Sequence, residues 1–560
     1  MANRIYGIDL GTTYSAISFV DEYGKAQIIT NSDSERITPS VVFFETEDNI
    51  IVGKIAKDSA RTDPGRVVDF VKRQMSDKDW TFEVDGKSYK PEEISAFILK
   101  RLASDANKTD EHDVKDVVIT VPAYFGDLER ERTRAAGRIA GLNVIEILDE
   151  PVAAAINYGL NDEAKGKNVI VYDLGGGTFD VTVVKIGSHP EKNEISIVCT
   201  EGNHRHGGKD WDDRIIKHYV DEFQRLTGSG TDLSYDQDAA YDLRINAETD
   251  KKTLTKREKA TRKVSHEGET ANIELHLEKF DELTKDLLEL TFALTDKVLE
   301  EAEKEGLKID SFLLVGGSTR MRQIKTKITE RYGARVGEIR ELGADADEAV
   351  AKGAAKAGEI KVIVHRLDEK AKKIAEGQGL EFDSLPKEKK EEIMQQAAEE
   401  VATDGGYKLE VVKKAESTIF NMVATKSYGI RVLKDGQPIV RNLIVKQTPV
   451  PAEGSQTFGT AGANADEIDL VVFINNESEN DAPFGVGEEL GNAVFPLDSN
   501  LPEKAPIEIT FKLDGQGALT LLGLDKTHGK RIEANFKSDG VMSDVEIQQA
   551  IDKSKDIVVE

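Results

Sequence analysis

Two short segments of this chain carry the same pattern of residues, one that could hold a phosphate group and a metal ion. The first is the run 6–13 (YGIDLGTT), and the second is the run 171–178 (VYDLGGGT). In each, an apolar run ends in Asp-Leu-Gly, and small residues with a threonine follow. Glycines allow backbone N–H groups to approach a ligand closely, and a row of such groups binds phosphate oxygens. An aspartate that leaves each strand could hold hydrated Mg²⁺, because this ion binds few carboxylates and keeps its waters.

Each motif is expected to form a β-hairpin with a tight glycine turn, since strand-like runs follow at 15–20 and 179–184. A single turn of this kind is more often only a hairpin. Two matched turns predict two related halves of the chain that face one polyphosphate. A third glycine-rich run, formed by Gly316, Gly317 and Ser318, favours nucleotide binding.

The composition argues against some classes of function. With 560 residues, the chain is long enough for several domains and at least two apolar cores. Its 103 acidic and 75 basic residues give a formal charge of -28, which disfavours binding to nucleic acid or to an acidic membrane surface. The single cysteine, Cys199, lies in an apolar run expected to be a buried strand, and it cannot form an internal disulfide. With neither an apolar leader nor a membrane-spanning run, we expect a cytoplasmic protein.

The pattern of apolar residues divides the chain into four parts. Residues 1–360 alternate strands and helices as in a layered α/β domain, and residues 361–420 form a charged helical stretch. Residues 421–540 are rich in strands that alternate apolar and polar residues, which predicts a β-sandwich. Residues 541–560 contain the start of a helix that begins near Ser543.

Turn and cap residues place individual elements within the first part. A strand over 117–122 ends at a proline and leads into a helix over 127–141, which ends in glycine. A strand over 143–148 precedes an alanine-rich helix. A helix over 280–305 is expected to bury one face, formed by Leu283, Leu287, Leu290, Leu294 and Val298.

The order of several motifs resembles the seventy-kilodalton heat-shock chaperone family, in the DnaK-like form. These motifs are YGIDLGTTYS, VKR at 71–73, VITVPAYF, AGRIAGL, LDEPVAAAINYGL, VYDLGGGTFDVTVV, GGKDWDDRI, LLVGGSTRM and DEAVAKGAA. The resemblance is close over residues 4 to about 358 and weaker over residues 421–550. It implies an actin-like ATPase domain of two ribonuclease-H-like halves that close on Mg·ATP. A helical insert would join this domain to a β-sandwich that binds peptides.

The resemblance also assigns the phosphate end of the site. The catalytic residues would be Lys72, Glu150, Asp173, Thr178 and Asp180. Lys72 would reach toward the γ-phosphate, where a fixed positive charge stabilises developing negative charge. Asp9 and Asp173 would hold Mg²⁺ through water, and K⁺ is a further candidate cofactor. The phosphates of ATP or ADP would lie against Asp9, Gly11, Thr12, Thr13, Tyr14, Gly175, Gly176 and Gly177.

The remaining nucleotide contacts come from later segments of the chain. By resemblance they are Gly207, Gly208, Glu248, Lys251, Lys252, Thr255, Gly316, Gly317, Ser318, Arg320 and Asp347. Lys252 stands where many family members have arginine. Because a lysine cannot stack a planar group on adenine, we expect weaker nucleotide affinity. The alternative for Glu248 and Lys251 is an ordinary ion pair on a helix surface.

In the β-sandwich, the resemblance implies a groove for unfolded or extended polypeptides. Ile430, Phe458, Ile468 and Leu470 would line an apolar pocket, and Leu433 and Ala461 would arch over the bound chain. Such a groove binds main chain along a strand edge and buries one apolar side chain. The alternative is that the four pocket residues belong to the sandwich core. A J-domain co-chaperone and a nucleotide exchange factor are the further partners that the resemblance implies.

Two departures from the family pattern bear on mechanism. The short leucine-rich linker with its aspartate is replaced by the helical stretch and by the run 418–423, which has no aspartate. We therefore expect altered coupling between ATP and peptide release. The helical lid of the family should follow Ser543, and this sequence ends near the first turns of that lid. A groove without a lid should release peptides quickly.

Taken together, these features predict a slow, Mg-dependent ATPase that acts as a cytoplasmic, ATP-dependent chaperone of unfolded proteins. The alternative is a nucleotide-sensing actin-like ATPase that binds one dedicated partner. A metabolite kinase of the same superfamily would need a catalytic aspartate and an acceptor pocket, and the sequence contains no motif for either.

Overall fold

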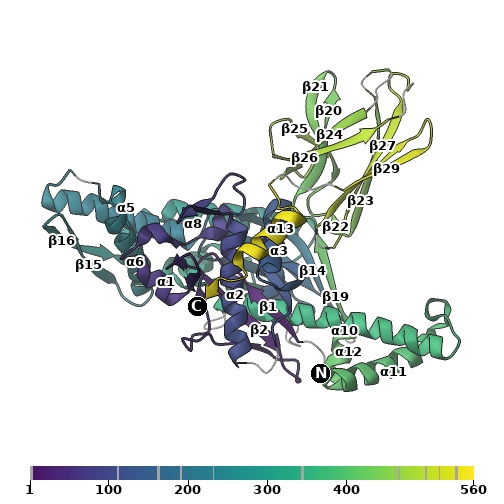
Figure 1. The fold of residues 1–560 in the computed structure, drawn as a ribbon, viewed down its shortest axis with the longest axis horizontal. Coiled ribbons are helices and arrows are strands. Elements are labelled where there is room, and N and C mark those ends of the chain that lie inside the picture. The colour runs from purple at the N-terminus through teal and green to yellow at the C-terminus, as the bar shows by residue number, and fades with distance from the viewer. Residues whose placement is uncertain are drawn as a thin grey trace.

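The chain folds into an α/β body, a β-sandwich above it and a helical arm at its base, as Figure 1 shows. The computed structural model describes residues 4–109, 113–159, 164–189, 192–230, 232–341, 346–460, 462–463, 467–497, 501–515, 517–535 and 540–560. Within these ranges, no helix is both long and apolar enough to cross a lipid bilayer.

The body is built from two sheets with the same strand order. The first runs β11 (Asn143–Asp149), β10 (Asp116–Val121), β1 (Ile5–Asp9), β2 (Tyr14–Val20) and β3 (Ala26–Ile28), with β4 (Thr38–Pro39) beside β2. The second runs β18 (Glu338–Glu341), β17 (Ser311–Val315), β12 (Asn168–Leu174), β13 (Phe179–Ile186) and β14 (Asn193–Asn203). In each sheet, the two central strands form an antiparallel hairpin, β1 with β2 and β12 with β13. The strand beside the hairpin runs parallel to its first strand: β10 to β1, and β17 to β12. The two predicted hairpins are confirmed, and we call the two halves lobe I and lobe II.

Two helices lie between the sheets and join the lobes. They are α4 (Glu150–Gly159), which follows the edge strand of lobe I, and α10 (Ala349–Gly377), which follows that of lobe II. A shared core contains apolar side chains from both sheets and both helices. The helices touch at Gly353, where a Cβ atom would lie only 1.7 Å from the carbonyl oxygen of Ala153. Glycine and alanine are therefore required by this close crossing.

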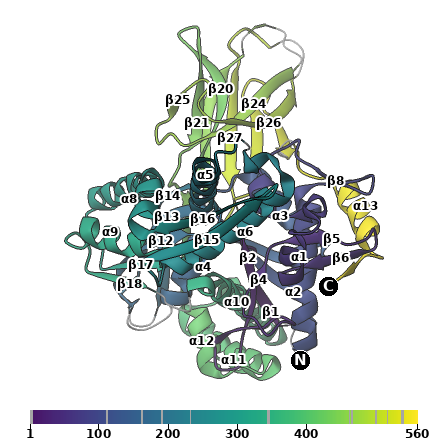
Figure 2. The ribbon, with the colours of Figure 1, turned by 90° about the vertical axis from the view of Figure 1, so that its left-hand side faces the viewer.

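Other elements surround the two central sheets (Figure 2). On lobe I they are α1 (Lys54–Ser59), α2 (Pro91–Thr109), α3 (Asp127–Ile139), β5 (Val42–Phe44), β6 (Asn49–Val52), β7 (Val67–Val68), β8 (Phe82–Val84) and β9 (Lys87–Tyr89). On lobe II they are α5 (Gly208–Thr227), α6 (Gln237–Leu254), α7 (Leu277–Leu283), α8 (Lys285–Lys304), α9 (Arg322–Tyr332), β15 (Lys259–His266) and β16 (Glu269–His276). Short 3-10 turns are η1 (Pro64–Arg66), η2 (Val71–Gln74), η4 (Leu233–Tyr235), η5 (Gly317–Arg320) and, in the arm, η7 (Phe382–Ser384).

The helix predicted over 280–305 differs from the observed one in its buried face. The helix is interrupted at Thr284, between α7 and α8. Leu290 is 39% exposed, so the predicted burial of this residue is wrong. Thr291 and Thr295 are buried instead, because each hydroxyl donates to a carbonyl of its own helix. A polar residue that satisfies itself in this way is invisible to a pattern based on apolar spacing.

The helical arm continues from the body without a break. The predicted domain boundary at residue 360 falls inside α10, which is followed by α11 (Lys387–Gly405) and α12 (Leu409–Glu416). The arm has its own small core, which includes Leu367, Ile393 and Val412. Gly406 adopts a left-handed conformation with φ 71°, which ends α11.

The arm leads directly into a strand shared by the body and the sandwich. Strand β19 (Thr418–Val423) pairs in parallel with β14 and antiparallel with β22 (Pro449–Val450). One sandwich sheet runs β25 (Asp481–Pro483), β21 (Gln437–Ile444), β20 (Ser427–Lys434), β24 (Glu467–Asn475) and β26 (Glu488–Pro496). The other runs β23 (Ala452–Gly459), β27 (Pro506–Leu513), β28 (Leu519–Asp525) and β29 (Lys530–Asn535), and one apolar core lies between them.

The C-terminal segment lies on lobe I, beside α2 and α3 (Figure 1). In α13 (Asp544–Ser554), Ile547 and Ala550 are buried against Ala135 and Ile139. The two residues of β30 (Val558–Val559) then pair in parallel with β6. This segment therefore adds one strand and one helix to the body.

Gly353 and Gly377 lie on the same helix α10, and they provide a matched test of the interlobe crossing. We expect Gly353→Ala to lower the free energy of unfolding by about 1–3 kcal/mol or more, because the methyl group has no space. Gly377→Ala should raise this free energy by up to about 1 kcal/mol, because alanine favours the helix. Among the described residues, no atom beyond its own helix and chain neighbours lies within 4 Å of the position that its Cβ would take. Urea unfolding of both variants measures the difference. Equal effects would contradict the crossing.

Candidate active site

A cleft of about 700 Å³ opens between the lobes. The predicted site residues that line it are Asp9, Gly11, Thr12, Thr13, Tyr14, Lys72, Glu150, Asp173, Gly175, Gly176, Thr178, Glu248, Lys251, Lys252, Thr255, Gly316, Gly317, Ser318, Arg320 and Asp347. Gly177, Asp180, Gly207 and Gly208 are not part of this lining. The fold thus gathers residues from segments more than 300 positions apart.

The two glycine turns touch each other at the floor of the cleft. A Cβ atom at Gly176 would lie 2.2 Å from the Thr13 hydroxyl oxygen. A Cβ atom at Gly177 would lie 2.4 Å from the methyl group of Thr12. Glycine is therefore the only residue that lets the second turn approach the first one this closely.

Neighbouring segments fix the backbone of each turn. In lobe I, the Ser40 hydroxyl donates to the carbonyl of Gly11 over 2.7 Å. In lobe II, the amides of Gly208 and Lys209 at the start of α5 donate to the carbonyls of Gly175 and Gly176, at 2.9 and 2.8 Å. Ser40 and Lys209 were not predicted as site residues. Ser40 belongs to no motif, while Lys209 lies inside the GGKD motif and could have been found there.

Lys72 and Glu150 form a buried ion pair beside the turns. The Lys72 ammonium donates to the Glu150 carboxylate, and the two residues are 5% and 7% exposed. Glu150 is the first residue of α4, where the partial positive charge of a helix N-terminus favours a carboxylate. This pair places one fixed positive charge next to one candidate base.

Three more carboxylates lie around this pair: Asp173 and Asp180 are buried, and Asp9 is half-buried. Burial, and then the nearby Glu150 carboxylate, raises the pKa of Asp9 to about 7. The same two causes hold the pKa values of Asp173 and Asp180 well above their usual range. Lys72 is the cation that acts on all three.

This donor set fits a divalent cation. Four carboxylates, three of them buried, share one ammonium group, so ionisation of all of them needs further positive charge. Among the described residues, no group of three or more histidine, cysteine, aspartate or glutamate side chains is arranged to hold a metal directly. A Mg²⁺ ion here would therefore keep water ligands, as it prefers.

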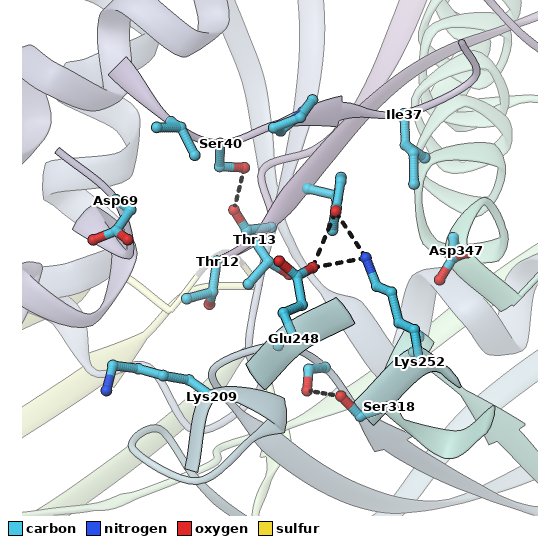
Figure 3. A pocket seen from close by; sticks show the side chains of 18 of the residues that line it. Thr12, Thr13, Ile37, Ser40, Asp69, Lys209, Glu248, Lys252, Ser318 and Asp347 are labelled. Atoms are coloured by element: carbon cyan, nitrogen blue, oxygen red, sulfur yellow. Dashed lines mark hydrogen bonds and ion pairs between the residues drawn. The ribbon is translucent and has the colours of Figure 1, made fainter. Parts of the chain in front are cut away.

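At the opposite end of the cleft, charged side chains from the two lobes meet. Figure 3 shows Glu248 and Lys252 pointing toward each other, and the ion pair between them measures 2.7 Å. Lys57 of lobe I also pairs with Glu248, and the Tyr14 hydroxyl donates to the Glu248 carboxylate over 3.1 Å. Although burial raises the pKa of Glu248, Lys57 and Lys252 lower it to about 2. Lys57 was missed, because no motif marks it.

The other predicted contacts at this end support the backbone. Lys251 donates to the Gly208 carbonyl over 2.7 Å and pairs with Asp212, so the alternative pair of Glu248 with Lys251 is wrong. Arg320 pairs with Asp347 at 2.7 Å. These bonds fix the C-terminal end of α6 against the start of α5 and hold the loop around Gly317.

The predicted peptide residues lie at one end of the sandwich. Ile430 and Leu470 are buried in its core, while Phe458 and Ile468 are only partly buried against it. Leu433 is 72% exposed. Ala461 lies outside the described residues.

The sandwich also contacts the body through polar side chains. Lys446 donates to Glu201 on β14 over 2.7 Å, and the Tyr428 hydroxyl donates to Asp127 on α3 over 3.3 Å. Burial raises the pKa of Asp127 to about 7. The Lys426 ammonium lies 3.6 Å from the ring centre of Tyr124. These contacts flank β19 and link the sandwich to β14 and to residues 124–127 of the body.

Comparison with known proteins agrees with this geometry. A family model described as "Hsp70 protein" matches residues 5–369. The chain belongs to the Hsp70 family. Its relatives include proteins named chaperone protein DnaK from Thermotoga petrophila and from Thermotoga maritima. Each is 33% identical over 558 residues, which is 98% of this chain and 83% of the relative. The family match ends within α10, so most of the arm and the sandwich of this Hsp70 chain lie beyond it.

Lys72→Ala tests the buried pair of this Hsp70 chain. We expect ATP hydrolysis to fall by at least about 100-fold, because the variant loses a fixed positive charge near the reacting phosphate. The fold should survive, since Glu150 keeps its place at the N-terminus of α4, where the helix dipole favours a carboxylate. Steady-state phosphate release and circular dichroism measure the two effects. The control is Lys304→Ala on an exposed i,i+3 pair, which should leave both unchanged. Near-normal hydrolysis in Lys72→Ala would refute the assignment.

The pKa of Asp9 predicts a pH dependence of stability. Because that pKa is about 7 in the folded chain and 3.8 ordinarily, the folded chain binds more protons between these pH values. Ionisation of Asp9 therefore lowers stability as the pH rises toward 7 and above. Asp9→Asn should stabilise the nucleotide-free protein more at pH 8 than at pH 5. Thermal unfolding at both pH values checks this, and an equal effect at both would contradict it.

Proposed function

We propose that this chain is an ATP-dependent chaperone. Its two-lobed body would hydrolyse ATP to ADP and phosphate, and its sandwich would bind exposed apolar segments of unfolded proteins. The observation that carries this proposal is the contact between the two glycine turns beside a buried lysine and four carboxylates. Membership of the Hsp70 family and relatives named chaperone protein DnaK support it.

In the proposed hydrolysis, a water oxygen attacks the γ-phosphorus, and the bond from that phosphorus to the ADP oxygen breaks. Lys72 would neutralise charge on the transferred group. Thr178, Glu150 and Asp180 would position the water. One proton of this water would pass to one of the two carboxylates, Glu150 or Asp180. Within the described part of the chain, Oδ1 of Asp180 is buried without a hydrogen-bond partner, which leaves it free to accept from water.

The cofactor of this reaction would be Mg²⁺, held through water by Asp9 and Asp173. When bound, the ion would supply positive charge to the phosphate oxygens. K⁺ remains a further candidate. We expect a slow turnover, because positioning and charge are all that the residues around the phosphate supply.

Functionally, we divide the chain into an ATPase domain (1–360), an insert and linker (361–420), a substrate-binding sandwich (421–540) and a C-terminal segment (541–560). Strand β19 would couple the first to the third, since it extends the lobe II sheet and continues into the sandwich. Any movement of lobe II on ATP binding would then displace the sandwich directly. The ion pair of Lys446 with Glu201 favours this route.

The partners would be unfolded or extended polypeptides, with a J-domain co-chaperone and a nucleotide exchange factor by family membership. We place the protein in the cytoplasm, because its single cysteine, Cys199, is a buried free thiol.

Titration of a fluorescent apolar peptide tests the chaperone proposal. We expect an affinity at least about tenfold weaker with Mg·ATP than with Mg·ADP, as coupling between two sites requires. Measurement of fluorescence anisotropy in both nucleotides gives the ratio. A protein that hydrolyses ATP but binds no peptide would overturn the proposal in favour of the dedicated-partner alternative.

A matched pair of exposed apolar residues locates the groove. Leu433→Asp should weaken peptide binding, because Leu433 is proposed to arch over the bound chain. Val545→Asp, on α13 and similarly exposed, should leave it unchanged. Neither change alters a buried side chain, so both variants should fold. If both variants bind peptide like the wild type, the proposed groove is in the wrong place.

A further inference from the structure

Phe70, two residues before Lys72, has an unusual backbone conformation. Its φ and ψ angles are 54° and 25°, in the left-handed region. A bulky residue is rarely found there, and such a conformation persists only when surrounding contacts enforce it. Phe70 is the N-cap residue directly before η2, the turn that carries Lys72. The strain is therefore located at the base of the candidate catalytic lysine.

The contacts that enforce this conformation come from the opposite lobe. Two cations of lobe II approach the Phe70 ring: the Lys209 ammonium at 5.6 Å and the Arg244 guanidinium at 5.9 Å from its centre. Cations at such distances are attracted to the face of an aromatic ring. Arg244 also lies 5.0 Å from the ring centre of Tyr241. The ring of Phe70 is thus held by side chains from α5 and α6.

Residues on both sides of Phe70 cross between the lobes too. Asp69 pairs with Arg244 at 3.0 Å. Arg73 donates to the Gly177 carbonyl over 3.0 Å and pairs with Asp210. In Figure 3, Asp69 and Lys209 lie on the same side of the cleft, one from each lobe. We call residues 69–73 the latch segment.

The latch segment and the pair of Lys57 with Glu248 cross the cleft at different places. The pair joins the lobes where Lys252 and Tyr14 lie, and the latch segment joins them beside the glycine turns. Asp69, Phe70, Lys72, Lys209 and Arg244 all line the cleft. A nucleotide whose phosphates lie on the turns could leave past this side only after these contacts break.

We infer that Phe70 is a positioning residue that locks the two lobes beside Lys72 and slows the release of nucleotide. The inference rests on the proposed ATPase function of the cleft. The αL backbone turns the ring toward Lys209 and Arg244, and the same turn of chain sets the position of Lys72. Closure of the lobes and placement of the lysine are thereby one event.

Release of ADP that carries a fluorescent N-methylanthraniloyl group tests this inference. Phe70→Gly removes the ring and suits the left-handed backbone, so the variant should fold. We expect it to release the labelled ADP about five- to tenfold faster than the wild type, because two cation–π contacts are lost. Phe70→Tyr retains the ring and should release at the wild-type rate.

Two further variants separate a latch from a general loss of order. Glu267→Gly relieves the same kind of backbone, with φ 47°, in a hairpin that does not line the cleft, and it should leave release unchanged. Arg244→Gln should speed release in the wild type but less in the Phe70→Gly background, because both changes remove the contact between Arg244 and the Phe70 ring.

The outcomes distinguish this inference from the function on which it rests. A wild-type protein that fails to bind the labelled ADP would overturn both. Tight binding with wild-type release from Phe70→Gly, or fully additive effects of Phe70→Gly and Arg244→Gln, would overturn the latch alone. Faster release that Phe70→Tyr does not rescue would also overturn it.

Discussion

The contact between the two glycine turns is the constraint on which the rest of the site depends. Gly176 and Gly177 approach Thr13 and Thr12 so closely that no side chain could stand in their place. Each turn belongs to a different lobe, so their contact defines the distance between two otherwise separate sheets. Helices α4 and α10, which lie between the sheets, approach each other equally closely where Gly353 meets Ala153. Close packing of small residues thus sets the geometry of the cleft.

Charge is the second constraint. A buried cluster with more carboxylates than ammonium groups is unfavourable by itself, and the raised pKa of Asp9 reflects this cost. A divalent cation bound beside these carboxylates would offset their mutual repulsion.

The connections around the body hold the sandwich and the C-terminal segment against it. The helical arm ends at Glu416, and β19 begins at Thr418, so one residue separates a packed helix from a paired strand. The segment that joins the body to the sandwich is therefore held at both ends. The C-terminal segment is similarly tied to lobe I, through the buried face of α13 and the pairing of β30 with β6. Both features restrict how the sandwich can move relative to the ATPase body.

The sequence by itself determined the elements whose causes are local. Glycine turns, the alternating strands of the sandwich and the end of α11 at Gly406 follow from backbone preferences and short-range periodicity. The family motifs also indicated Lys72, Glu150 and the aspartates. Only the tertiary structure decided which residues oppose them. Leu290 is exposed, whereas Thr291 and Thr295 are buried and donate to carbonyls of their own helix. Lys57, Phe70 and Lys209 contact residues of the opposite lobe, and Ser40 supports the first glycine turn within its own lobe. Contacts of this kind join residues far apart in the chain, so no spacing in the sequence records them.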